Sequence, residues 1–167
     1  SKVTRSEVRH RGIDLSVIAR EVIAGLQAGA PQRKVKVEIE PDLQALGDPG
    51  LLRLALANLL SNAWKYTGRH HEAHISLAAE RREDGTLVYA LRDNGVGFDA
   101  TQAHQLFEPF RRMHTEAEFP GTGVGLAIVR RVIQKHGGRI WAEAAPDQGA
   151  TFYFTLPESD ASFRLEG

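Results

Sequence analysis

The chain has 167 residues, enough for one domain with a core of ordinary size. Its 21 basic residues balance its 21 acidic residues, so bulk charge indicates no nucleic-acid or membrane-surface partner. It has no cysteine, which excludes disulfides, thiolate metal sites and cysteine nucleophiles. No apolar run approaches the ~20 residues of a membrane helix and no signal peptide is visible, so a cytoplasmic location without membrane contact is expected.

The expected elements alternate between helix and strand. Residues 1–13 are polar and basic, which is typical of a linker or of the end of a preceding helix. Ser1 in place of an initiator Met is expected for a fragment or a processed product. Asp14 or Ser16 is the expected cap of the first helix. Periodicity and turn residues predict helices over 16–28, 49–66 and 124–136, and strands over 34–40, 74–80, 87–93, 139–144 and 150–156.

This order predicts a mixed sheet with helices on one face. The fold class is therefore a two-layer α/β (α+β) sandwich, with one domain over residues 14–157 and a C-terminal tail at 158–167. The segment from Asn94 to Gly121 is rich in glycine, proline and charge, and it is expected to be a long loop with a short helical turn near 102–107.

The second predicted helix carries a polar stripe of Asn58, Asn62 and Lys65, which share one face because residues i, i+4 and i+7 stack on a helix. Such a stripe can be simply solvated. However, asparagine is a poor residue in the middle of a helix. A carboxamide oxygen suits Mg²⁺ and a lysine suits phosphate. The stripe is therefore predicted to be one wall of a nucleotide site.

Two glycine-rich motifs could complete that site. The run from Asp93 to Gly97, DNGVG, follows a strand, and the Asp93 carboxylate can accept the exocyclic amine of adenine, although an ordinary Asx turn would look similar. The run Gly121-Thr122-Gly123-Val124-Gly125 opens the last helix and can bind anions through backbone N–H groups. A dinucleotide fingerprint does not fit this second run, because its third glycine would fall on Leu126 and no strand precedes it.

Other nucleotide and metal signatures fit less well. A Walker A loop and the eukaryotic-type protein kinase motifs are absent. The run from His70 to His74, HHEAH, contains metal-ligand residue types, but it lacks HExxH spacing and is interpreted as a solvated loop.

Together these segments resemble the ATP-binding catalytic domain of bacterial sensor histidine kinases (HATPase_c), in the GHKL superfamily with the Bergerat fold. The resemblance covers about residues 14–157, and the lid sequence 110–120 looks most like phytochrome-type and other PAS-linked kinases. The family's ordered N, G1, F and G2 boxes correspond to residues 58–67, 93–99, 106–110 and 121–126.

The resemblance implies roles for the motif residues. Asn62 matches the Mg²⁺ ligand, and Lys65 and Tyr66 match residues at the phosphates and the nucleotide. Asp93 matches the adenine-binding carboxylate. Arg112 matches a lid residue that reaches the terminal phosphate. The other residues expected to bind ATP are Gly95 and Gly97 beside adenine, Gly121, Thr122, Gly123, Val124, Gly125 and Leu126 in the G2 box, and Thr151 near adenine.

Asn58 indicates which reaction is expected. Relatives that hydrolyse ATP carry glutamate at this position to activate water, whereas asparagine cannot act as a general base. Asn58 fits an enzyme that transfers the γ-phosphoryl group to an imidazole, which is already a nucleophile. The alternatives are a GHKL-type ATPase and a nucleotide-binding regulatory module.

The phosphoacceptor segment of the family, similar to S-H-E-L-R-T-P, does not occur in this sequence, and His10 lacks its context. The resemblance therefore implies a catalytic module of a larger kinase, whose partners are a histidine-bearing dimerisation domain and a response regulator. The isolated domain is expected to be monomeric. Residues 99–122 are expected to form a mobile ATP lid, anchored by Phe107 and Phe110 unless these are ordinary core aromatics.

Overall fold

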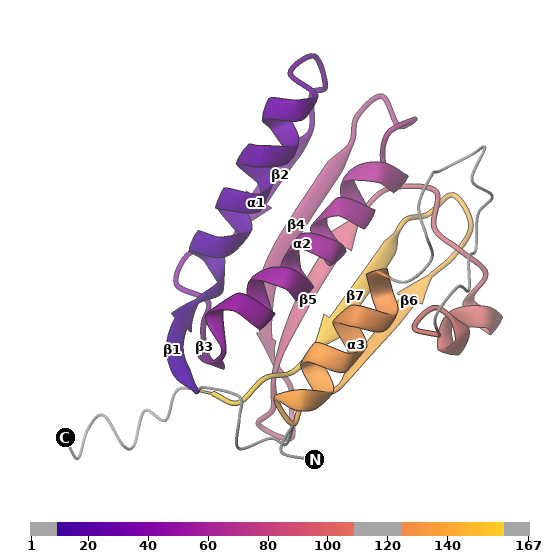
Figure 1. Cartoon of the computed structure of the whole chain (residues 1–167). Coiled ribbons are helices and arrows are strands. Elements are labelled where there is room, and N and C mark those ends of the chain that lie inside the picture. The colour runs from indigo at the N-terminus through magenta and orange to yellow at the C-terminus, as the bar shows by residue number, and fades with distance from the viewer. Residues whose placement is uncertain (1–9, 109–124, 159–167) are drawn as a thin grey trace.

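The computed structural model describes residues 10–108 and 125–158, and Figure 1 shows their arrangement. In chain order the elements are β1 (Arg11–Asp14), α1 (Leu15–Gly29), β2 (Lys36–Ile39), β3 (Gln44–Gly47), α2 (Pro49–Tyr66), β4 (His74–Arg81), β5 (Leu87–Asp93), the 3-10 helix η2 (Ala100–Gln105), α3 (Gly125–Lys135), β6 (Ile140–Ala144) and β7 (Ala150–Phe154).

The main sheet has five strands in the order β2-β4-β5-β7-β6. β2 is parallel to β4, and the other neighbouring pairs are antiparallel. The helices α1, α2 and α3 lie side by side on one face of this sheet (Figure 1). The predicted two-layer α/β sandwich with a mixed sheet is confirmed.

Local capping explains where the first two long helices begin. Asp14 is the N-cap of α1 and accepts a hydrogen bond from the Ser16 backbone N–H at 2.9 Å. The buried Ser16 hydroxyl instead joins two other segments, donating to Glu40 O and accepting from Leu43 N–H. Asp48 caps α2 by accepting from Leu51 N–H at 3.0 Å, and Pro49 occupies the first turn, where it has no hydrogen-bonding cost.

A small ribbon that the sequence did not predict closes one end of the sandwich. β1 pairs antiparallel with β3, so that Ile13 lies opposite Ala45 and both are buried. Residues 11–13, which the sequence pattern assigned to a linker, therefore belong to a strand. Each strand has only four residues and one of them in each is glycine, so the alternation was too short to be informative.

The core lies between the helices and the sheet. From α2 it receives Leu52, Leu56, Leu59 and Leu60, each at most 2% exposed. From the sheet it receives Ile75, Leu77, Tyr89, Leu91 and Phe154. α2 lies between α1 and α3 (Figure 1). The apolar side of α2 is thus occupied by packing, and its remaining side chains can serve a site.

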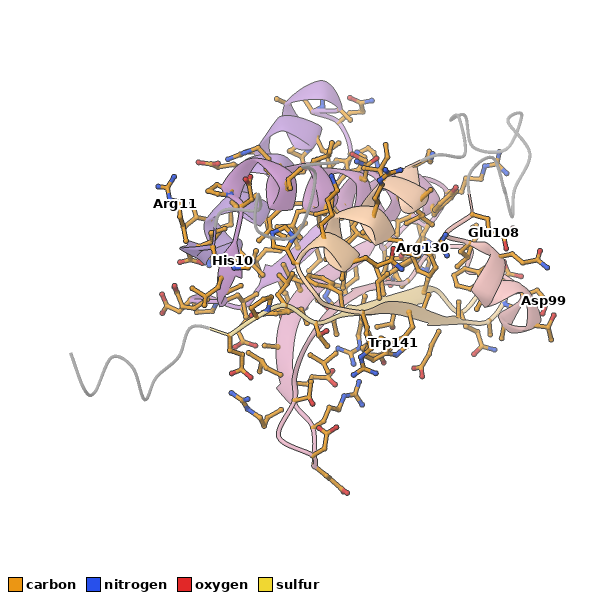
Figure 2. The ribbon with its side chains drawn as sticks, turned by 60° about the horizontal axis from the view of Figure 1, so that its bottom comes forward. His10, Arg11, Asp99, Glu108, Arg130 and Trp141 are labelled. Atoms are coloured by element: carbon orange, nitrogen blue, oxygen red, sulfur yellow. The ribbon has the colours of Figure 1, made fainter. Side chains whose placement is uncertain are left out.

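The opposite face of the sheet is covered by its own side chains. Trp141 stacks on Tyr153 with ring centroids 5.5 Å apart, and these residues cover the buried Val88 and Ala90. Figure 2 shows that Asp99 and Glu108, next to η2, lie on the opposite side of the molecule from His10 and Arg11. Among the described helices none is both long and apolar enough to cross a membrane.

Candidate nucleotide site

The polar stripe of α2 contacts the start of α3 at Asn58. Asn58, Asn62 and Lys65 are all half-buried. The Asn58 amide donates to Leu54 O at 2.9 Å, and a Cβ placed on Gly125 would lie 2.8 Å from the Asn58 carboxamide oxygen. Glycine at the first position of α3 therefore lets the two helices approach at this point, which joins the N box to the end of the G2 box.

Asp93 ends β5 as a half-buried carboxylate. It accepts a hydrogen bond from the Gly95 backbone N–H at 2.8 Å, so the Asx-turn alternative from the sequence is also present. Burial raises the pKa of Asp93 to about 6, although backbone N–H groups of Gly95 and Ala150 partly oppose this rise. A ligand that donates a hydrogen bond to this half-buried carboxylate would stabilise its charged form.

The glycines after Asp93 are required by close backbone packing. A Cβ on Gly95 would lie 2.3 Å from Tyr66 O, and Val96 N–H donates to the same Tyr66 carbonyl at 3.2 Å. Gly97 has a φ of +65°, and a Cβ there would lie 2.0 Å from Ala145 O. The loop after β5 is therefore fastened directly to the last turn of α2.

A turn that the sequence analysis did not assign to the site supports Asp93 from the other side. Asp147 N–H donates to Val96 O at 2.6 Å. Gly149 has a φ of +82°, and a Cβ there would lie 2.1 Å from Asp93 O. The sequence predicted strands over 139–144 and 150–156 on either side of this turn, but the contact of the turn with Asp93 depends on the pairing of β5 with β7.

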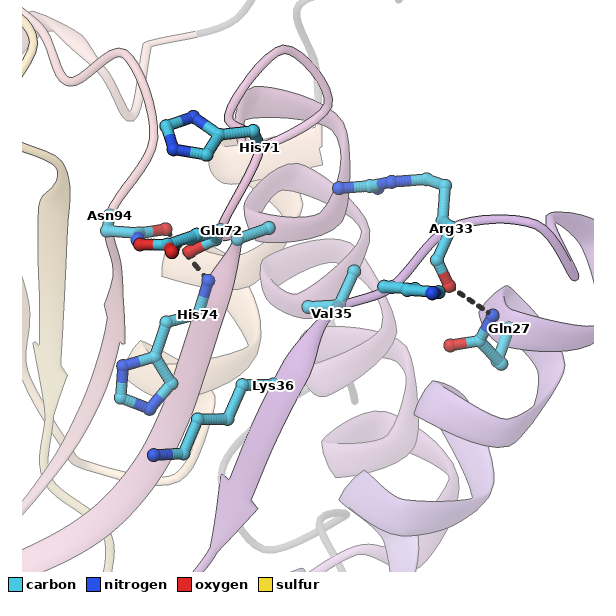
Figure 3. A pocket seen from close by; sticks show the side chains of 10 residues that line it. Gln27, Arg33, Val35, Lys36, His71, Glu72, His74 and Asn94 are labelled. Carbon is cyan, nitrogen blue, oxygen red and sulfur yellow. Dashed lines mark hydrogen bonds between the residues drawn. The ribbon is translucent and has the colours of Figure 1, made fainter.

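Asn94 is a second supporting residue that sequence reasoning missed. Its side-chain oxygen accepts from His74 N–H at 2.8 Å, and its side-chain nitrogen donates to Glu72 O at 2.8 Å (Figure 3). Its backbone N–H also donates to His74 O at 3.2 Å. Asn94 thereby joins the end of β5 to the start of β4 immediately beside Asp93.

Thr151 in β7 is not paired with Asp93. Thr151 pairs with Arg92 and Glu143, whereas Ala150 pairs with Asp93. Because successive side chains of a strand point to opposite faces, Thr151 is on the face away from the helices and Asp93 is on the covered face. Thr151 therefore does not share a face of the sheet with Asp93, and Ala150 is the strand neighbour of Asp93.

Several predicted residues lie outside the described part of the chain. These are Phe110, Arg112, Gly121, Thr122, Gly123 and Val124. Of the remaining candidates, Lys65 and Tyr66 are adjacent, with the Lys65 ammonium 5.1 Å from the Tyr66 ring centroid. Leu126 packs against the core and against a smaller cluster that contains Phe98 and Phe107.

Phe107 behaves as a core aromatic. It is 5% exposed, and its ring centroid lies 6.1 Å from that of Phe152 in β7. Phe98 approaches the same Phe152 ring edge-on at 6.3 Å. The cluster attaches the segment after the G1 box to the sheet, so the core-aromatic alternative describes Phe107.

The histidine-rich loop has no metal-binding geometry. His70 and His71 stack at 5.4 Å, and the His74 ring nitrogen lies 2.6 Å from the Glu38 carboxylate. Over residues 10–108 and 125–158, no group of three His, Cys, Asp or Glu side chains is placed to hold a metal ion.

Comparison with known proteins identifies the family. Residues 47–160 match the family described as histidine kinase-, DNA gyrase B-, and HSP90-like ATPases. The chain is 33% identical over 144 residues to the phytochrome-like protein Cph1 of Synechocystis, covering 86% of this chain and 19% of that protein. The mycobacterial sensor histidine kinase MprB superposes with a TM-score of 0.73 at 27% identity, covering 89% of this chain and 97% of that one. Full-length ShkA in complex with AMPPNP superposes with a TM-score of 0.72 at 27% identity, covering 91% of this chain and 32% of the ShkA chain.

The chain therefore belongs to the family of histidine kinase-, DNA gyrase B- and HSP90-like ATPases. Within that family it is the ATP-binding catalytic domain of a two-component sensor histidine kinase. This confirms the family inferred from the ordered boxes, including its likeness to phytochrome-type kinases. The chain spans less than half the length of these curated relatives.

Proposed function

We propose that this domain binds Mg-ATP along α2 and transfers the γ-phosphoryl group to a histidine on a dimerisation domain of the same kinase. The observation that carries the proposal is the attachment of the Asp93 loop to the end of α2, through Val96 N–H and Tyr66 O. Through this contact the Asp93 loop lies against the end of the helix that bears Asn62 and Lys65. One ligand with an adenine at one end and phosphates at the other would match that order.

Asp93 supplies selectivity for the base. A carboxylate only accepts hydrogen bonds, and the exocyclic amine of adenine donates one. Guanine has a carbonyl at the equivalent position, which would set an acceptor oxygen against the half-buried carboxylate in place of a donor, and this is costly. We therefore assign Asp93 to discrimination between ATP and GTP.

Asn62 is the residue that would hold Mg²⁺. Its carboxamide oxygen is a neutral, hard donor on the half-buried stripe of α2. Mg²⁺ commonly takes only one or two protein ligands and completes its shell with waters and substrate phosphates, so a single asparagine fits this ion. When bound, the ion neutralises charge that develops on the phosphates during transfer. Lys65 adds a positive charge on the same stripe.

Asn58 favours transfer over hydrolysis. A carboxamide cannot take a proton from water, and the Asn58 side-chain amide already donates a hydrogen bond to Leu54 O. Water in the site would therefore lack a base, whereas an incoming neutral imidazole needs none. His10 does not supply that imidazole. It lies on the opposite side of the molecule from Asp99 and Glu108, which are next to η2 (Figure 2).

The test is phosphorylation in trans. The chain is incubated with γ-labelled ATP and Mg²⁺, with and without a separately produced histidine-bearing dimerisation hairpin from a phytochrome-like relative. We expect acid-labile phosphate on the hairpin, none on the hairpin's His→Ala variant, and negligible phosphate release by the chain alone. Sustained phosphate release without a hairpin would instead indicate an ATPase. A response regulator added afterwards would test the expected second partner.

A further inference from the structure

A cavity lies near the start of β2, outside the nucleotide site. Its volume is about 710 Å³, which is within the range of small-molecule sites. The last turns of α1, the residues leading into β2 and the loop before β4 line it, and Asn94 forms part of its wall (Figure 3). None of Asn58, Asn62, Lys65 and Asp93 contributes to it.

Positive charge predominates in this cavity. The lining contains the cations Arg33, Lys34 and Lys36 and one carboxylate, that of Glu72. Lys36 lies 3.8 Å from a carboxylate oxygen of Glu38, but both side chains are more than half exposed, so water weakens this pair. Lys34 is exposed, and no ion pair joins it to another described residue.

Arg33 is a fixed cation with neutral partners. One guanidinium nitrogen donates to Trp64 O at 2.6 Å and another to the Thr67 hydroxyl at 3.2 Å. The guanidinium also lies over the Trp64 ring, 4.7 Å from its centroid. Burial lowers the pKa of Arg33, because neither the carbonyl nor the hydroxyl compensates its charge. An anion in the cavity would provide that compensation.

We propose that this cavity binds a small phosphate-bearing ligand at a site separate from the ATP site. The immobile guanidinium of Arg33 sets the position of the anion at little entropic cost, and a guanidinium matches the geometry of phosphate oxygens. The two lysines carry flexible ammonium groups that can close on a dianion from the β2 side. Glu72 opposes binding, so its charge limits the affinity.

The experiment is an NMR titration of the whole chain with inorganic phosphate at constant ionic strength, followed through the backbone amides. We expect saturable shifts at residues 33–36 and 71–74. The double substitution Lys34→Gln and Lys36→Gln should weaken binding by about tenfold or more. Glu72→Gln should strengthen it severalfold, and acetate should bind more weakly than phosphate.

Arg131→Gln is a control, because Arg131 is an exposed cation on α3 and its substitution removes elsewhere one of the two units of charge that the lysine double substitution removes. The affinity of this variant for phosphate should equal that of the unaltered chain. Shifts that never saturate, shifts confined to residues 58–66 and 93–97, or equal effects of the lysine and Arg131 substitutions would overturn the proposal. Acetate binding as tightly as phosphate would also overturn it. All these substitutions are at exposed side chains, so the fold should persist.

Discussion

Asp93 carries an electrostatic cost in the nucleotide site, because burial disfavours its charged form. Its folded-state pKa of about 6 lies above the ordinary 3.8, so the folded protein holds this proton more tightly than the unfolded chain does. Stability from this group is therefore present at low pH and is lost as pH rises from about 4 to above 6. The difference corresponds to about 3 kcal/mol.

The substitution Asp93→Asn should have opposite effects on the stability of the fold and on the affinity for ATP. The variant removes the cost of ionisation, so at pH 8 its free energy of unfolding should exceed that of the unaltered chain by up to about 3 kcal/mol, and at pH 3.5 the two should agree. Urea denaturation at both pH values measures this. The same variant should bind ATP at least about tenfold more weakly, because one acceptor oxygen is replaced by an NH2 donor and the negative charge is lost. A variant that gains no stability at pH 8 would contradict the assigned cost.

Asn94 positions Asp93 without needing to contact the nucleotide. Asn94→Ala removes its two side-chain hydrogen bonds to the β4 entrance, which should cost about 2 kcal/mol of stability. It should also weaken ATP-analogue binding by about fivefold at 10 °C, well below the unfolding transition, as measured by calorimetry. Asp84→Ala, which removes a hydrogen bond at the distant β4–β5 turn, should leave affinity unchanged. Equal affinities for both variants would show that Asn94 is only structural.

At the scale of elements, the turn after β6 fixes the end of β5. Gly149→Ala places a Cβ against Asp93 O and adopts a positive φ, so it should cost about 3 kcal/mol of stability and weaken nucleotide binding. Gly85→Ala is the matched control, because Gly85 has a φ of +90° but open space around it. That variant should lose about 1 kcal/mol and bind nucleotide normally. Thermal unfolding and calorimetry of the pair separate backbone strain from the contact with Asp93.

His136 joins α3 to the beginning of α2. It is 1% exposed, and its two ring nitrogens contact Val132 O at 2.8 Å and Asp48 N–H at 3.0 Å. His136→Ala should therefore destabilise the domain by about 3 kcal/mol, through a cavity and two lost hydrogen bonds. The exposed His70→Ala should change stability by less than about 0.5 kcal/mol. Urea denaturation of both variants measures the difference, and similar values would contradict this role.

Across the whole molecule, sequence periodicity was sufficient for the long elements. The stripe of leucines in α2 and the alternation in β4 and β5 each extend over several residues, so the helix-on-sheet layers follow directly. The strands β1 and β3 were not predicted, because a four-residue segment that includes a glycine shows little alternation of apolar and polar residues. The face on which Thr151 lies could not be predicted, because a shift of one residue reverses every side chain of a strand and register depends on pairing.

The supporting parts of the site could not be read from the sequence for a related reason. Tyr66 and Gly149 contact Asp93 or its loop through backbone atoms of segments distant in sequence, and the Asn94 side chain joins the same loop to the start of β4. The sequence identified the motif glycines as positions for a ligand, whereas the structure shows backbone packed against Gly95 and Gly97. The cationic cavity likewise combines residues 33–36 with residues 71–74 and Asn94.

The most direct test is a calorimetric titration of the chain with a non-hydrolysable ATP analogue, with and without Mg²⁺, beside the variants Asn62→Ala and Asp93→Asn. We expect metal-dependent binding in which Asn62→Ala loses most of the metal dependence and Asp93→Asn loses affinity with and without metal. GTP analogue should bind the unaltered chain much more weakly than ATP analogue. Binding that does not depend on Mg²⁺ and is unaffected by both substitutions would contradict the account.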